Sequence, residues 1–246
     1  MDRPAASASS SAAQPELSVV IPFYNEEANV GKVLAELRET LTQLGIQVEV
    51  LAVNDGSRDR TGPEIDAAAQ AWPAVRPIHF AKNSGQAAAL YHGFHEARGT
   101  YLAMLDGDGQ NPPSELARLW AQRESADMIA GARAKRRDST LRRLMSRTAN
   151  GVRRLLLRDG VTDTGCSLKV FRREVARSFI PLRTMYSFLP AFAVSAGFTV
   201  KQVFVEHRPR TAGESKYGFG VMAIHPMLDM LSLCWLLRRT VRQSQR

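Results

Sequence analysis

Long apolar runs alternate with amphipathic segments along the first half of the chain. Four runs have the length and continuous hydrophobicity of strands buried on both faces of a sheet: residues 17–24, 48–55, 76–80 and 101–106. Amphipathic segments of helical period lie between them, notably at 26–44 and 85–97. Strand–helix alternation implies parallel pairing through right-handed crossovers. The pattern therefore predicts an α/β fold with a central, mostly parallel sheet and helices on both faces.

The first helix has recognisable boundaries in the sequence. Asn25 stands just before it and is expected to cap its N-terminus, with Glu26 and Glu27 in the first turn. Gly45 follows the last leucine of the apolar stripe and is expected to end the helix.

The regular alternation fades after Pro113. Further strands are expected at 127–134, 166–173 and 199–210, with a buried helix in the uncharged run 184–200. Two amphipathic helices rich in arginine are expected at 139–158 and 225–246, both suited to a membrane interface. The chain is thus expected to divide into a disordered polar segment at 1–16, a folded domain at 17–220, and a membrane-associated helix with a basic tail at 221–246.

A polar cluster follows each of the four strands in the first half. The clusters are YNEE at 24–27, NDGS at 54–57, KNSGQ at 82–86 and DGDGQ at 106–110. Because the carboxyl ends of parallel strands share one edge of the sheet, all four clusters are expected along that edge. Ligands bind there in open α/β sheets, so the four clusters predict a binding site.

Asp106 and Asp108 stand one residue apart, directly after an apolar strand. In an extended turn both carboxylates can reach one hard divalent cation, with Gln110 as a neutral oxygen ligand. A few protein ligands plus phosphate oxygens is the usual way in which Mg²⁺ is held. An acidic surface turn is the alternative interpretation of so short a motif.

The net charge of +9 is concentrated in one segment. Residues 131–158 hold ten lysines and arginines and one acid, Asp138. Such a patch points to an anionic partner: nucleic acid, a membrane surface or phosphate groups. A solvated basic face is the alternative.

Cysteine content and apolar segments indicate the compartment. Cys166 and Cys234 are far apart and lack metal-ligand spacing, which fits a reducing cytosol. The N-terminus has no apolar signal region. The uncharged run 184–200, broken by Pro190, is shorter than the roughly 20 residues that a transmembrane helix needs. We therefore expect a cytoplasmic protein attached peripherally to the cytoplasmic face of the membrane.

Seven segments occur in an order that resembles glycosyltransferase family 2. They are VVIPFYNEEANV, VNDGSRDRTG, KNSGQAAAL, LDGDGQNPP, SRTAN, TGCSLKVFRREV and RPRTAGESKYG, spread over about residues 17–220. The resemblance implies an inverting nucleotide-sugar transferase of the Rossmann-like GT-A fold. The most similar branch contains dolichol-phosphate mannose synthase and the undecaprenyl-phosphate sugar transferases.

The resemblance also implies roles for individual positions. It places the nucleotide sugar, GDP-mannose or a UDP-sugar, against Pro22, Tyr24, Asn25, Glu26, Asp55, Gly56, Gly85, Gln86, Asp106 and Asp108. Among these, Asp55 is the acid expected to hydrogen-bond the nucleobase. It assigns a divalent cation, Mg²⁺ or Mn²⁺, to Asp106, Asp108 and Gln110. It gives catalytic roles around the phosphate groups to Asp108, Arg133, Arg147, Arg210, Ser215 and Lys216.

The expected acceptor is a polyprenyl phosphate. A hydroxyl acceptor needs a general base, and relatives with such acceptors carry an adjacent acidic pair, whereas Asp163 and Glu174 stand apart here. A phosphate monoester is largely ionised at neutral pH and needs no base. A soluble transferase for saccharide hydroxyls is the alternative. A basic nucleic-acid-binding module is more distant, because no aromatic stacking surface accompanies the patch. An anionic membrane surface is the expected partner, and a small membrane-anchor protein is a further candidate.

Overall fold

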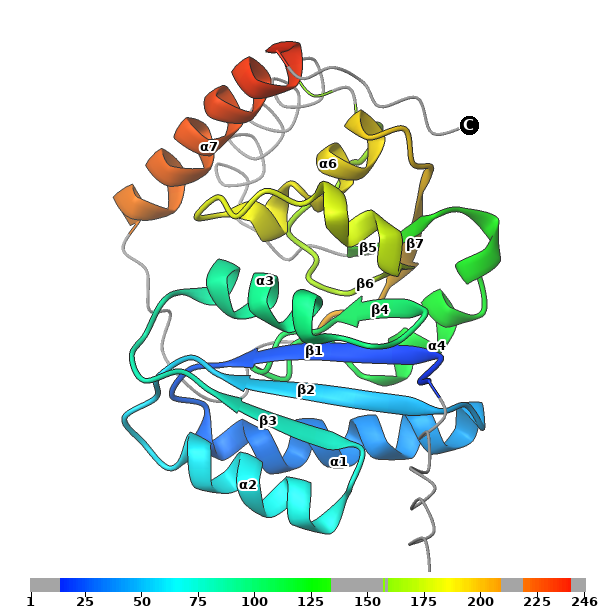
Figure 1. Cartoon of the computed structure of the whole chain (residues 1–246), viewed down its shortest axis with the longest axis vertical. Helices are drawn as coiled ribbons and strands as arrows, with labels where there is room; N and C mark the ends of the chain where they lie inside the picture. The colour runs from blue at the N-terminus through cyan, green and yellow to red at the C-terminus, as the bar shows by residue number, and fades with distance from the viewer. Residues whose placement is uncertain (1–13, 134–156, 158, 209–218, 240–246) are drawn as a thin grey trace, which may run out of the picture.

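A seven-stranded sheet forms the centre of the molecule in the computed structural model, which describes residues 14–133, 157, 159–208 and 219–239 (Figure 1). In order across the sheet the strands are β3 (Val75–His79), β2 (Val48–Asn54), β1 (Leu17–Phe23), β4 (Tyr101–Met104), β6 (Lys169–Arg172), β5 (Met128–Arg133) and β7 (Val200–Val205). Strand β6 runs antiparallel to β4 and β5, and the other pairs are parallel. The predicted mostly parallel α/β sheet is confirmed.

Helices cover both faces of this sheet, as predicted (Figure 1). One face carries α1 (Glu27–Leu44), α2 (Thr61–Ala71) and α4 (Ser114–Trp120). The other carries α3 (Gln86–Glu96) and α6 (Leu189–Ser195), followed outward by α7 (Phe219–Arg239). Short 3₁₀ turns η1 (Arg123–Ser125), η2 (Arg173–Ser178) and η3 (Met185–Ser187) connect these elements.

Alternate residues of the strands enter two separate cores. Val19 and Ile21 of β1 pack with the helices of the first face, whereas Val20 packs with those of the second. Because successive side chains of a strand point to opposite faces, a run such as 17–23 must be apolar throughout when both faces are covered. The continuous hydrophobicity of the four predicted strands follows from this double burial.

The start of α1 differs from the prediction. Its N-cap position is Glu26, whose side chain caps no backbone N–H of the helix but accepts a hydrogen bond from Asn29 Nδ2 at 2.6 Å. Asn25 has a left-handed backbone (φ 50°), and its Oδ1 accepts a hydrogen bond from the backbone N–H of Arg58 at 2.9 Å. Asn25 therefore ties the loop after β1 to the loop after β2 instead of capping the helix. Gly45 does end α1, with φ 63°.

The C-terminal helix α7 begins ahead of the predicted start at His225. Its inner side is held firmly: Leu233 is fully buried, and Asp229 Oδ2 accepts hydrogen bonds from Thr184 N and Oγ1, both at 2.7 Å. Apart from Leu157, the basic helix predicted at 139–158 lies outside the described residues. No helix of the described part of the chain is long and apolar enough to cross a bilayer.

Candidate active site

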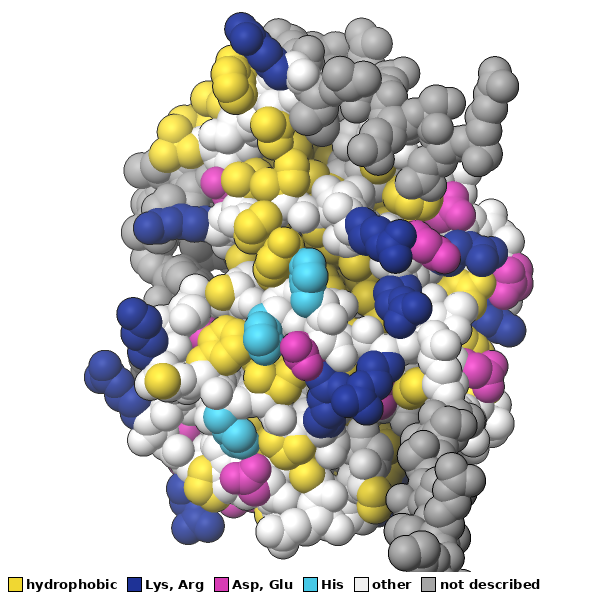
Figure 2. All heavy atoms as spheres, viewed as in Figure 1, with side chains coloured by type: hydrophobic (Ala, Val, Ile, Leu, Met, Phe, Trp, Pro, Cys, Tyr) yellow, Lys and Arg dark blue, Asp and Glu magenta, His cyan; other side chains and the backbone are white. Residues whose placement is uncertain are grey.

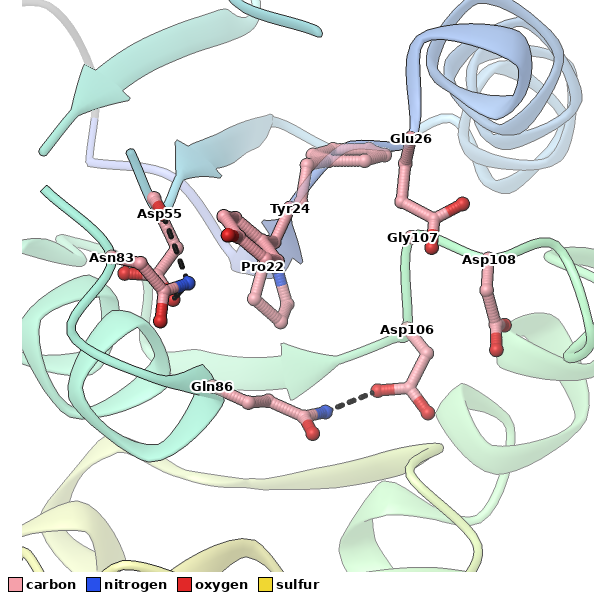
Figure 3. A pocket seen from close by; sticks show the side chains of 10 residues that line it. Pro22, Tyr24, Glu26, Asp55, Asn83, Gln86, Asp106, Gly107 and Asp108 are labelled. Carbon is pink, nitrogen blue, oxygen red and sulfur yellow. Dashed lines mark hydrogen bonds between the residues drawn. The ribbon is translucent and has the colours of Figure 1, made fainter. Parts of the chain in front are cut away.

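A pocket opens at the carboxyl edge of the parallel strands. It is lined by Pro22, Phe23, Tyr24, Glu26, Asp55, Asn83, Gln86, Asp106, Gly107 and Asp108. Figure 3 shows Asp55 and Asn83 at one end, Tyr24 near the middle, and Asp106 and Asp108 at the other end. The four polar clusters recognised in the sequence each contribute to this lining, so the structure brings them together as expected from parallel pairing.

The carboxylate of Asp55 is fixed by the loop that follows β3. Its Oδ1 accepts a hydrogen bond from Ser84 N–H at 2.7 Å, and its Oδ2 accepts from Gly85 N–H at 2.9 Å and from Asn83 Nδ2 at 2.8 Å. Burial raises the pKa of Asp55, while the N–H groups of Ser84 and Gly85 oppose that rise. The loop thus presents this acid to the pocket in one orientation.

Three residues predicted at the nucleotide site support the pocket without lining it. Gly56 has φ 64°, and a Cβ there would lie 2.3 Å from the backbone carbon of Lys82, so only glycine lets the two loops meet. Gly85 precedes α3 and donates its N–H to Asp55. Asn25 joins neighbouring loops, as described above. Asn83, which the sequence analysis did not single out, does line the pocket, and its place in the KNSGQ cluster was the available signal.

At the other end of the pocket, Asp106 is half-buried next to a second acid. Gln86 Nε2 donates a hydrogen bond to its Oδ1 at 2.7 Å. Burial, and after it the negative charge of Asp108, raise the pKa of Asp106 to about 6 against the opposing effects of Ser167, Lys169 and Gln86. Two carboxylates that repel each other in one pocket are a donor set that suits a hard divalent cation.

The turn that carries both aspartates packs tightly on β1. A Cβ on Gly107 would lie 2.4 Å from Phe23 Cδ1 and 2.8 Å from the carbonyl oxygen of Pro22, so glycine is required there. Asp108 Oδ1 accepts a hydrogen bond from Gln110 N–H at 3.0 Å, and Gln110 is not among the lining residues. Within the described ranges no group of three or more His, Cys, Asp or Glu could hold a metal. A cation held by Asp106 and Asp108 would complete its coordination with water or with phosphate oxygens of a bound nucleotide.

Strand β6 and the segment just before it support Asp106 with residues to which the sequence analysis gave no role at this site. Ser167 hydrogen-bonds Asp106 and accepts a hydrogen bond from Asn111 Nδ2 at 2.7 Å. Lys169 is buried, its Nζ donates to Cys166 O at 2.5 Å, and burial lowers the pKa of its ammonium group. A lysine within an apolar strand was the signal that could have indicated this contact.

Arg133, predicted to bind phosphate, is engaged with an acid of the same chain. Its Nε and Nη2 donate to the two carboxylate oxygens of Asp163, both at 2.8 Å. Burial alone would raise the pKa of Asp163, but the hydrogen bonds and charge of Arg133 outweigh it and lower the pKa to about 2. The other predicted phosphate ligands, Arg147, Arg210, Ser215 and Lys216, lie outside the described residues.

The sheet and its edge pocket have the GT-A-like architecture of nucleotide-sugar transferases. Residues 18–179 match the model of glycosyl transferase family 2, and the chain belongs to that family. Undecaprenyl-phosphate 4-deoxy-4-formamido-L-arabinose transferase of Pseudomonas aeruginosa is 35% identical over 218 residues, covering 88% of this chain and 64% of the relative. Its counterpart in Shewanella sediminis is also 35% identical, covering 88% of this chain and 66% of the relative. The chain thus spans less than two thirds of both relatives' length.

Solved structures of low sequence identity share the fold. Glucosyl-3-phosphoglycerate synthase of Mycobacterium tuberculosis, in complex with Mg²⁺ and UDP, has a TM-score of 0.72 at 19% identity, covering 90% of this chain and 80% of that one. A mannosyltransferase of Pyrobaculum calidifontis, in complex with GDP-Man and Mn²⁺, has a TM-score of 0.66 at 18% identity, covering 94% of this chain and 66% of that one.

Proposed function

We propose that this protein transfers a single sugar from a nucleoside-diphosphate sugar to a polyprenyl phosphate, with inversion, at the cytoplasmic membrane surface. The observation that carries the proposal is the pocket with Asp55 at one end and the Asp106–Asp108 pair at the other. The relatives named above support the acceptor, because their names specify undecaprenyl phosphate.

The pocket offers a different contact to each part of the donor. At the Asp55 end a fixed carboxylate accepts a hydrogen bond from an N–H of the base, and Pro22 and Tyr24 flank the nucleoside. The diphosphate then reaches Asp106 and Asp108. Asp106 and Asp108 would hold a Mg²⁺ or Mn²⁺ ion, with Gln110 as a further candidate ligand, and the ion would supply positive charge that offsets the charge of the departing nucleoside diphosphate. Gln86 orients Asp106 for this task through its 2.7 Å hydrogen bond.

In the described part of the chain, neither Asp163 nor Glu174 is suited to act as a general base, which favours an acceptor that needs none. Asp163 is a poor proton acceptor, because Arg133 holds its pKa at about 2. Glu174 lies in η2, where the preceding Arg173 N–H bonds to Thr100 O at the opposite end of β4 from Asp106. A polyprenyl phosphate is already ionised near neutral pH. We assign Arg133, Arg147, Arg210, Ser215 and Lys216 to holding its phosphate beside the donor, since arginine pairs with two phosphate oxygens at once.

The outer side of α7 suits attachment to a membrane. Met227, Leu228, Leu231 and Trp235 are 51–62% exposed, whereas Leu233 faces the core. The Arg239 guanidinium lies 5.4 Å from the Trp235 ring centroid. A cation therefore stands next to the last of these exposed apolar side chains. Figure 2 shows hydrophobic side chains along this helix on the outer surface. Such a face lies in the membrane interface instead of spanning the bilayer.

Turnover measurements with both acceptor classes test the proposed function. We expect sugar transfer from a GDP- or UDP-sugar to a short polyprenyl phosphate, with inverted configuration at the anomeric carbon by NMR. An acceptor phosphate that displaces the leaving group directly must attack from the opposite face. Transfer to a saccharide hydroxyl with none to polyprenyl phosphate would favour the soluble alternative, and retained configuration would contradict direct displacement.

A further inference from the structure

A histidine that has no role in the proposed reaction contacts the residue just before Asp55. Asn54 and His79 are cross-strand partners at the ends of β2 and β3. Asn54 Nδ2 lies 3.1 Å from His79 Nδ1, and His79 Nε2 lies 3.0 Å from Asp66 Oδ1 in α2. Asn54 is buried, whereas the imidazole reaches the surface. A chain of contacts therefore runs from solvent to the strand end just before Asp55.

The hydrogen-bond donors along this series of contacts determine which tautomer of His79 fits between Asn54 and Asp66. The backbone N–H of Ser57 can only donate, and it lies 3.0 Å from Asn54 Oδ1, which identifies that atom as the amide oxygen. The other amide atom, Nδ2, is then a donor, so His79 Nδ1 must accept its hydrogen. The ring proton consequently sits on Nε2, where it is donated to Asp66. The contacts require the neutral Nε2–H imidazole.

The amide has little freedom to turn if this contact is lost. A Cβ on Gly62 in the first turn of α2 would lie 3.1 Å from Asn54 Nδ2 and 3.7 Å from His79 Nδ1, so α2 packs directly against the pair. The groups that face the ring are Asp66 and Gly62 from α2 and Asn54 from β2. Asp66 accepts from Nε2–H in either protonation state. A second proton, on Nδ1, would place two donors face to face and separate Asn54 from the ring.

Movement of Asn54 would reach the pocket through two covalent neighbours and two hydrogen bonds. Asn54 directly precedes Asp55, and its Oδ1 holds the N–H of Ser57. Ser57 Oγ in turn accepts a hydrogen bond at 3.0 Å from the backbone N–H of Asn25, the residue after Tyr24. Both loops at the nucleoside end of the pocket thus depend on this amide.

We propose that His79 is a positioning residue for the nucleotide site: as a neutral imidazole it holds Asn54, and through Asn54 the loop 54–57, in the shape that binds a nucleoside diphosphate. The ligand in this inference rests on the proposed function. Loss of the imidazole should therefore weaken nucleotide binding.

Two substitutions test the hydrogen bonds of His79. His79→Gln supplies an oxygen that accepts from Asn54 and an N–H that donates to Asp66. His79→Leu removes both contacts. We expect calorimetry with UDP and GDP, each with Mn²⁺, to show about fivefold weaker binding by the Leu variant at pH 8, the equivalent of one ordinary hydrogen bond. The Gln variant should bind like the wild type, because it keeps both contacts.

The control is His95→Leu, because His95 is exposed on α3 and its Nδ1 contacts Tyr91 O, away from the loop. It should bind like the wild type. Wild-type affinity of His79→Leu, or an equal loss in His79→Leu and His95→Leu, would overturn the inference.

Hydrogen exchange without nucleotide gives an answer that is independent of the ligand. His79→Leu should speed exchange of the amides at 55–58, above all that of Ser57, while His79→Gln and His95→Leu should not. If the wild type binds neither nucleotide, the proposed function fails, and the exchange rates still decide on His79. Unchanged exchange in the Leu variant would show that His79 does not hold the loop.

Discussion

Asp106 is a half-buried carboxyl that must be ionised to bind a cation. Its pKa of about 6 means that the metal-free carboxyl takes up a proton as the pH falls through 6. A cation must displace that proton, so metal binding and protonation compete. Since Asp108 contributes to the raised pKa, the two acids disfavour each other's charge until a cation joins them.

We expect the apparent affinity for Mn²⁺ to be constant above about pH 7 and to fall by about tenfold per pH unit below pH 6. Asp108→Asn should abolish most metal binding and turnover while the fold persists, because one of the two carboxylates is lost. Mn²⁺ binding can be followed by electron paramagnetic resonance between pH 5 and 8. Glu39→Gln, on the exposed side of α1, is the matched control. Full turnover in EDTA would contradict a metal role.

The Arg133–Asp163 pair should contribute to stability above about pH 4. The folded-state pKa of Asp163 is lowered from 3.8 to about 2, so its stabilising effect is complete above the unfolded value and is lost as the pH falls through about 2. At roughly 1.4 kcal/mol per pKa unit, Asp163→Asn should lower the free energy of unfolding by about 2 kcal/mol at pH 7. Urea denaturation at pH 7 and pH 3 measures this difference, which should shrink at pH 3. Equal stability of the variant and wild type at pH 7 would contradict it, and Glu174→Gln, exposed in η2, is the control.

Among the elements, the strands of the first half could be predicted almost to the residue, because burial on both faces leaves an uninterrupted apolar run. The direction of β6 could not, because an apolar strand has the same pattern whether it runs parallel or antiparallel. Partners far apart in the sequence were missed for a related reason. Nothing at Arg133 indicates that the acid thirty residues later occupies its guanidinium, and nothing at Asn25 indicates that Arg58 takes its side-chain oxygen.

The helix α7 is the element whose function is most directly testable. Leu231→Glu together with Trp235→Glu should reduce binding to vesicles, because both side chains leave an apolar stripe that the structure exposes. Vesicle flotation at low salt, with neutral and with anionic lipids, measures the loss, and anionic lipids should bind more strongly since salt-sensitive attraction to basic residues adds to burial.

Phe204→Glu provides the matched control for α7. Phe204 is 66% exposed on β7 and belongs to a different element, so this change should leave flotation unaffected. Equal flotation of the α7 double variant and the wild type would exclude this face as the membrane contact. A separate anchor protein would then become the favoured explanation for action on a lipid acceptor.

For the whole molecule, the preferred nucleotide can be found from thermal stability. A ligand at 100 times its Kd stabilises the folded state by about 2.7 kcal/mol, which raises Tm by roughly 5–10 °C in a protein of this size. We expect UDP or GDP with Mn²⁺ to give such a shift and ADP to give much less. Asp55→Asn should reduce the shift, since its carboxylate lies at the nucleoside end of the pocket. An equal response to all bases would argue against recognition by Asp55.

The reversed strand β6 also determines when the site can form as the chain folds. Strands β1 to β4, with the acids at positions 55, 106 and 108, complete one half of the sheet from consecutive segments. The next neighbour of β4 is β6, which lies some sixty residues later, beyond β5. Contacts between distant segments form slowly, because a long loop must close first. During synthesis, a nucleoside-binding half can therefore exist while β4 is still an open edge, and Asp106 gains Ser167 and Lys169 only after most of the chain has emerged.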